Sequence, residues 1–152
     1  AAVPAAIEAI ETADAIILGP GSLYTSIMPN LLVDGVARAL KRSRAIKIYI
    51  CNVMTQAGET DEYSAFDHAK AIFDHTGRGA IDYVLVNSAP IPEKFLAETG
   101  AVPVEVDEDK INALGCGLIK ADLISETDAG RHDPDKLCAA VMKVIYSFGS
   151  KN

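Results

Sequence analysis

The stretch AIILGPGSLYTS, Ala15 to Ser26, runs from four apolar residues into a Gly-Pro-Gly turn and then into serine and threonine side chains. A short apolar run with β-branched residues that ends at glycine predicts a buried strand followed by a tight turn. In an open parallel sheet, ligands bind beyond the carboxyl end of such a strand, where backbone N–H groups of the next helix are free. The stretch therefore predicts either a phosphate-facing loop or a plain strand-to-helix turn, and its residues alone leave both open.

The rest of the chain repeats this alternation of short apolar runs with longer stretches of helical period, which is typical of parallel strands joined by crossover helices. We expect strands at Ala15–Leu18, Ile46–Cys51, Tyr83–Val86, Val102–Val106 and Leu118–Ile124. We expect helices over residues 1–14, over 31–40 with Asn30 as the cap, over 62–75 ending at Gly77, and over 134–148 with Asp133 as the cap. The sequence thus predicts a single α/β domain over residues 1–152, with a mostly parallel sheet covered by helices on both faces.

Composition limits the classes of partner. The chain has 152 residues and a formal net charge of -7, so broad attraction to nucleic acid or to an anionic membrane is not expected. Its three cysteines are far apart and form no Cys-x-x-Cys pair, which favours a reduced, cytoplasmic protein. No run approaches about 18 apolar residues, and the first residues lack the basic region of a signal peptide.

The Gly-Pro-Gly turn has the composition of an anion loop. Gly19 and Gly21 would let the backbone approach a ligand, Pro20 would stiffen the turn, and Ser22 could donate a hydrogen bond. The turn nevertheless lacks the lysine of a Walker-A loop, and Tyr24 stands where a dinucleotide fingerprint has its third glycine.

A second polar segment, residues 51–63, again follows an apolar strand. The amides of Asn52 and Gln56 could form hydrogen bonds with the edge of a base or sugar. Glu59 could accept a hydrogen bond from a sugar hydroxyl or assist a magnesium ion. In the alternative, Thr60 simply caps the next helix, which explains Thr60 but not Asn52 and Gln56.

A third candidate precedes the last helix. Arg131 and His132 lie where a guanidinium and free backbone N–H groups could converge on one anion. The alternative is a surface ion pair of Arg131 with Glu126 or Asp128, which contributes little stability.

A metal site is not expected. His68 and His75 each follow an aspartate, but seven helical residues separate them by about 10 Å, too far to share one ion easily. The spacing of serine, cysteine and histidine also supports no covalent catalysis.

Four segments can be compared with known families: ADAIILGPGSLYTSIMPNLLVDGV, KIYICNVMTQAGETDEYSAFDHAKAIFDHTG, DYVLVN and RHDPDKL. Together they resemble the gluconeogenesis-factor (YvcK) family, within the superfamily of CofD-type 2-phospho-L-lactate transferases. The resemblance runs from about Pro4 to about Phe148. Family members open with a Gly-Gly-Gly-Thr-Gly type turn that is absent here, so the resemblance implies the C-terminal half of a longer Rossmann-like protein. The implied partners are the missing N-terminal half or another subunit, in a homo-oligomer.

The resemblance implies a regulatory protein of carbon metabolism and cell shape that binds a nucleotide sugar such as UDP-N-acetylglucosamine, with no established reaction. Carried over by motif, the turn would face the diphosphate, Asn52 and Thr55 the neighbouring part of the ligand, and Arg131 the sugar or its phosphate. The residues of that turn are Gly19, Pro20, Gly21, Ser22 and Leu23. Phe95 stands where relatives often have a ligand-contacting tyrosine, which would lose a hydroxyl contact but keep stacking.

Two alternatives stay open. One is a transferase of phosphorus-containing groups, in which Gly21, Ser22 and Arg131 clamp the phosphates and Glu59 assists a magnesium ion. The other is an assembly module without a ligand, in which a free sheet edge pairs with another chain.

Overall fold

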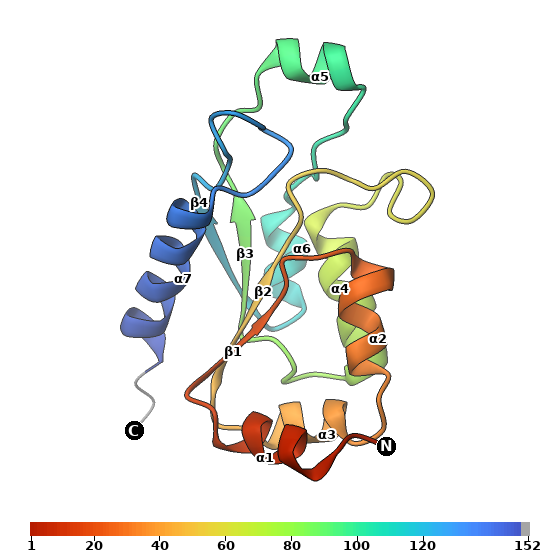
Figure 1. The fold of residues 1–152 in the computed structure, drawn as a ribbon, viewed down its shortest axis with the longest axis vertical. Coiled ribbons are helices and arrows are strands. Elements are labelled where there is room, and N and C mark those ends of the chain that lie inside the picture. Colours follow the sequence, from red (N-terminus) through yellow and green to blue (C-terminus); the bar gives the residue numbers. More distant parts are fainter. Residues whose placement is uncertain (150–152) are drawn as a thin grey trace.

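The computed structural model describes residues 1–149, and residues 150–152 lie outside the described part. It contains one four-stranded sheet in the order β1-β2-β3-β4, in which every neighbouring pair is parallel (Figure 1). The strands are β1 (Ala15–Leu18), β2 (Ile46–Ile50), β3 (Tyr83–Asn87) and β4 (Gly117–Ala121). Four of the five predicted strands are confirmed, with ends shifted by at most a few residues.

Helices cover both faces of the sheet, as Figure 1 shows. The long helix α7 (Pro134–Phe148) covers one face, and α4 (Ala65–Thr76) with α6 (Glu108–Ala113) covers the other. Helices α1 (Pro4–Thr12) and α3 (Val36–Arg42) lie near the amino ends of the strands, and α5 (Glu93–Thr99) lies beyond the carboxyl ends. The expected three-layer, Rossmann-like α/β fold is therefore confirmed.

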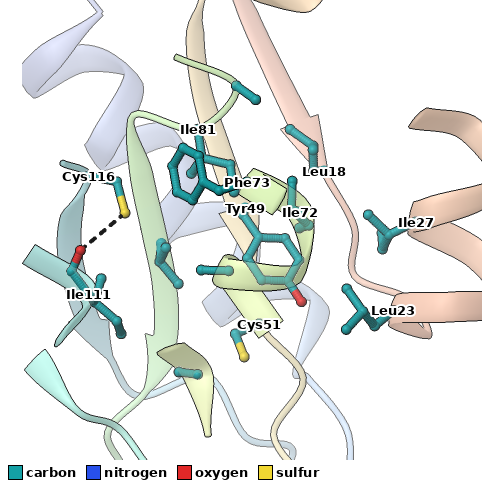
Figure 2. Close-up of a cluster of buried hydrophobic side chains, with 14 of the residues drawn as sticks. Leu18, Leu23, Ile27, Tyr49, Cys51, Ile72, Phe73, Ile81, Ile111 and Cys116 are labelled. Atoms are coloured by element: carbon teal, nitrogen blue, oxygen red, sulfur yellow. Dashed lines mark hydrogen bonds between the residues drawn. The ribbon is translucent and has the colours of Figure 1, made fainter. Parts of the chain in front are cut away.

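The two faces of β2 carry two hydrophobic clusters, because successive side chains of a strand point to opposite faces. Ile46, Ile48 and Ile50 pack on the α7 side. Tyr49 and Cys51 pack on the α4 side, among side chains from β1, α4 and the segment after β1 (Figure 2). Every residue of β2 is buried, as expected for a strand covered on both faces.

The prediction of one helix over residues 31–40 is wrong. The structure has α2 (Met28–Leu31), a break, and then α3. Gly35 immediately precedes α3 with φ +96°, a left-handed conformation that interrupts a right-handed helix. Asn30 lies inside α2 rather than capping a helix, and its Nδ2 donates to the Ser26 carbonyl at 2.7 Å.

The start of α4 is later than expected. Ser64 is its cap, and Ser64 and Asp67 bond each other's backbone N–H groups in a capping box. Thr60 does not cap this helix, because its Oγ1 accepts from the backbone N–H of Gln56 at 2.9 Å. The predicted end of the helix at Gly77 is confirmed.

Residues 102–106 do not form the predicted strand. The segment makes only an isolated bridge between Pro103 and Met54, since proline has no N–H to donate to a ladder. The residues on either side of Pro103 still bind the loop after β2. Thr55 N donates a hydrogen bond to the Val102 carbonyl at 2.8 Å, and Val104 N donates one to the Val53 carbonyl at 2.9 Å. The segment therefore supports a loop instead of extending the sheet.

None of the helices within residues 1–149 has the length and apolar character needed to cross a membrane.

The cap of α7 is as predicted and gives a direct test. Asp133 accepts from the backbone N–H groups of Asp135 and Lys136, both at 3.0 Å. We expect Asp133→Ala to lower the free energy of unfolding by about 1 kcal/mol, because two N–H groups lose their partner. Urea denaturation measures it, with Asp133→Asn as the control that keeps an accepting oxygen. Equal losses in the two variants would contradict this role of the cap.

Candidate functional site

A groove of about 560 Å³ opens at the carboxyl ends of β1 and β2. Three segments line it: residues 20–22 after β1, residues 52–56 after β2, and residues 130–132 before α7. Parallel strands end at the same edge of a sheet, so loops far apart in sequence meet there. The groove thus contains residues from all three polar segments singled out in the sequence.

The Gly-Pro-Gly turn, which begins with a cis Gly19–Pro20 bond, is closely packed against its surroundings. Gly19 has φ +93°, and a Cβ there would lie 3.2 Å from the Ile50 carbonyl oxygen. A Cβ on Gly21 would lie 3.0 Å from the Cβ of Ser26. Both glycines are therefore needed for the turn to lie against β2 and the helical turn that follows it.

The chain continues from this turn into a π-helical turn, Leu23–Ile27. The N–H groups of Ser26 and Ile27 both donate to the Ser22 carbonyl, at 2.9 and 3.0 Å. The side chains of Leu23 and Ile27 are buried against β1 and β2 (Figure 2). Leu23 therefore has only its backbone left for the predicted contact with a ligand.

Gln56 joins the first two loops of the groove. Its Nε2 donates to Ser22 Oγ at 2.8 Å, and its Oε1 accepts from Asn52 Nδ2 at 3.4 Å. This network explains the two amides that helix capping left unexplained. It also fixes the position of the Ser22 hydroxyl at the groove.

Arg131 supplies the positive charge of the groove lining. Its side chain is 82% exposed, and Nε lies 3.2 Å from a carboxylate oxygen of Asp128, as the surface-pair alternative predicted. Such an exposed ion pair contributes little to the stability of the fold. A phosphate can therefore replace the Asp128 carboxylate beside Arg131 with little loss of stability. The expected free N–H groups beside it are not available, because Asp133 already caps α7.

His132 also lines the groove and carries an imidazole with a buried nitrogen. Its Nε2 has no hydrogen-bond partner within the described part of the chain. Burial lowers the pKa of His132 below its usual value, so the ring is neutral near pH 7. The guanidinium of Arg131 is thus the groove's source of full positive charge.

Glu59 and Phe95 do not line the groove. Glu59 is half-buried, and its Oε2 is buried with no partner among residues 1–149. Phe95 instead packs on the loop beside the groove, since a Cβ on Gly130 would lie 3.0 Å from Phe95 Cζ. Gly130, Val53 and Met54 line the groove without having been named as candidates, whereas His132 lies there as predicted. The one feature of the sequence that could have indicated Gly130 is its position directly before the candidate Arg131.

The groove lining does not fit a magnesium ion held by the protein. Magnesium prefers carboxylate oxygens, and none of the described residues that line the groove carries a carboxylate. Within residues 1–149 there is also no group of three or more His, Cys, Asp and Glu side chains placed to hold a metal. His68 is buried inside α4, where its Nδ1 donates to the Ser64 carbonyl at 2.8 Å.

The parallel sheet and the groove at its carboxyl edge define a Rossmann-like α/β protein with a groove where such folds hold phosphorylated ligands. The family model described as 2-phospho-L-lactate transferase CofD matches residues 1–124. The chain belongs to this CofD family, among its gluconeogenesis factors.

The relatives are close in sequence but much longer. A gluconeogenesis factor of Halalkalibacterium halodurans is 50% identical over 141 residues, which are 90% of this chain and 44% of that protein. The gluconeogenesis factor of Bacillus subtilis is 43% identical over 146 residues, covering 93% of this chain and 46% of that protein. A crystal structure of a UPF0052-family protein from Bacillus halodurans superposes with a TM-score of 0.86 at 50% identity, over 92% of this chain and 46% of that one. The chain spans less than half the length of these proteins, in agreement with the predicted resemblance to one half of the family's protein.

Proposed function

We propose that the groove binds the phosphates of a nucleotide sugar of the UDP-N-acetylglucosamine type, and that the chain acts as a regulatory binding protein. The observation that carries the proposal is the meeting of residues 20–22, 52–56 and 130–132 in one groove. These segments bring a glycine-containing backbone, the Ser22 hydroxyl, amides and one arginine to the same place. This set of groups suits an oxygen-rich anion with attached hydroxyl groups.

The charge of the chain supports a local mode of binding. At a net charge of -7 the whole molecule repels anions, so a phosphate must be held by short contacts. A carboxylate-free lining with Arg131 at one wall provides such contacts. The proposed role of Asn52 and Thr55 is to bind the part of the ligand next to the phosphates.

A regulatory role is favoured over catalysis because none of the described residues that line the groove is an activated nucleophile. The Ser22 hydroxyl accepts a hydrogen bond from the Gln56 amide, which is not a base. Burial raises the pKa of Cys51, at the end of β2, to about 12, so its thiol stays protonated. Links to carbon metabolism and cell shape, and a cytoplasmic location, belong to this proposal.

The second candidate is transfer of a phosphorus-containing group, favoured by the description of the matching family model. It needs the magnesium ion to be held by the ligand or by a partner, since the described groove lining has no carboxylate. The third is assembly: β1 pairs only with β2 among the described strands, so its outer edge can receive a strand from another half or subunit.

Calorimetric titration of the chain separates these functions. We expect binding of UDP-N-acetylglucosamine and UDP, with little change when magnesium is added. Preference for GDP together with a strict need for magnesium would favour the transferase. Absence of binding to all three compounds, with or without magnesium, would overturn the nucleotide proposal.

Arg131→Ala is expected to weaken binding of UDP-N-acetylglucosamine by about 1.5–3 kcal/mol, because a charge-assisted hydrogen bond to the phosphate is lost. The matched control is Arg42→Ala, which removes the same charge from α3, where Arg42 pairs with Glu11 far from the groove. The control should bind as the unchanged chain does. Equal affinity of the unchanged chain and both variants would show that Arg131 forms only a surface ion pair and does not bind the ligand.

A further inference from the structure

A second cavity adjoins the groove at the carboxyl ends of β2 and β3. We call it the β3 pocket; it holds about 310 Å³. Asn52 and Val53 line both the β3 pocket and the groove, so the two spaces meet across these residues. The rest of its wall comes from β3, the loop after it, α5 and residues 103–106. One elongated ligand can therefore occupy both spaces.

The chemistry of the β3 pocket differs from that of the groove. Its wall is mainly aliphatic, with Val86, Ile91, Leu96 and Val104, and no described residue that lines it carries a charge. The Cys51 thiol in its wall is protonated, because burial raises its pKa to about 12. Such a pocket disfavours a phosphate, which would lose its water without gaining an opposite charge, and suits a flat, weakly polar ring.

Few polar side chains of the β3 pocket are free to read a ligand. The Asn87 amide is already engaged: its Nδ2 donates to the Ala89 carbonyl, and its Oδ1 accepts from Ala89 N and Leu123 N. Asn52 donates one hydrogen bond, to Gln56 at 3.4 Å, and an amide has further donor and acceptor capacity. Ser88 adds an exposed hydroxyl at the rim.

The wall of the β3 pocket is held in place by backbone hydrogen bonds. Val104 N donates to the Val53 carbonyl at 2.9 Å, and Ser88 N to the Ala121 carbonyl at 2.8 Å. Together with the bonds of Asn87, these contacts fix the loops on two sides of the cavity. A preformed wall lowers the entropy lost when a rigid ring binds.

We propose that the β3 pocket binds the nucleobase of the nucleotide whose phosphates lie in the groove, with Asn52 and Ser88 at the edge of the base. This inference rests on the proposed function. A cavity of about 310 Å³ is near the lower end of the usual ligand-pocket range of roughly 300–1,000 Å³, so it takes one ring system rather than a whole nucleotide. The sugar of the nucleotide sugar then lies at the other end of the groove, beside Arg131 and His132.

A variant that fills the β3 pocket tests which end of the ligand binds there. Ala89 lines the β3 pocket, is half-buried, and contributes only backbone atoms to the bonds with Asn87, so Ala89→Phe fills space without removing a hydrogen bond. Ala101→Phe is the control at a half-buried alanine outside both cavities. Calorimetry uses UDP, UDP-N-acetylglucosamine and N-acetylglucosamine 1-phosphate as probes.

We expect Ala89→Phe to weaken UDP and UDP-N-acetylglucosamine about tenfold or more, and to leave N-acetylglucosamine 1-phosphate within about twofold. Ser88→Ala, at an exposed position that does not endanger folding, should weaken UDP by about two- to tenfold. Unchanged UDP affinity in both variants, or a loss confined to the sugar phosphate, would overturn the base assignment while the proposed function stands. If the unchanged chain binds none of the probes, the proposed function itself fails.

Discussion

Gly19→Ala should lower the free energy of unfolding by about 3 kcal/mol. A non-glycine residue in a left-handed conformation costs about 1–2 kcal/mol, and the new Cβ adds overpacking of about 1–3 kcal/mol. That Cβ would lie 3.2 Å from the Ile50 carbonyl oxygen and 3.4 Å from Ile27 Cδ1, so it presses on both β2 and the π-helical turn. Since Pro20 and Gly21 line the groove directly after Gly19, ligand affinity should fall as well.

Gly58→Ala separates the two contributions. Gly58 has φ +80°, but a Cβ there would meet nothing within 4 Å. We expect it to lose only about 1 kcal/mol, the backbone contribution, and to keep the affinity of the unchanged chain. Urea denaturation of both variants measures the difference. Equal losses would show that close packing around Gly19 contributes nothing.

The strands of the sheet could be predicted because each is a short apolar run whose pattern is local. The segment Val102–Val106 is also a short, mainly apolar run. There the prediction fails because Pro103 has no N–H group to donate to a neighbouring strand. The break before α3 was missed for a related reason. An apolar stripe continues through residues 31–40, but the positive φ of Gly35 interrupts the helix, and a stripe does not reveal a backbone angle.

The groove could be predicted in outline because parallel topology brings the ends of neighbouring strands together. Individual side chains depend on geometry that sequence does not fix. Leu23 is buried because the π-helical turn directs it toward β2, and Phe95 reaches the site only indirectly, through Gly130. The bond between Gln56 and Ser22 joins residues 34 positions apart, and no local pattern indicates such a contact.

Tyr49 connects the core to the groove. Its side chain is fully buried on the α4 face of β2, in the cluster that also holds Leu23 and Ile27 of the π-helical turn (Figure 2). Burial raises the pKa of Tyr49 well above its usual value, so the phenol is neutral at all physiological pH values. Its hydroxyl makes no hydrogen bond of normal geometry within residues 1–149, and the polar group beside it is the protonated Cys51 thiol, which forms only weak hydrogen bonds. The ring, and not the hydroxyl, therefore supports the turn that carries Ser22.

Tyr49→Ala is expected to lower the free energy of unfolding by about 3–5 kcal/mol, because a large buried ring leaves a cavity that its neighbours fill only in part. Tyr49→Phe keeps the ring and removes a buried polar group without a partner, so stability should stay within about 1 kcal/mol of the unchanged chain or rise. The two variants are compared by urea denaturation, and the affinity for UDP is measured on each at a temperature where it is folded. The alanine variant should bind more weakly because the π-helical turn loses its support, whereas the phenylalanine variant should bind normally. A loss of about 2 kcal/mol or more in Tyr49→Phe would show that the hydroxyl is bonded in the folded protein, and a small loss in Tyr49→Ala would show that the ring does not hold the turn.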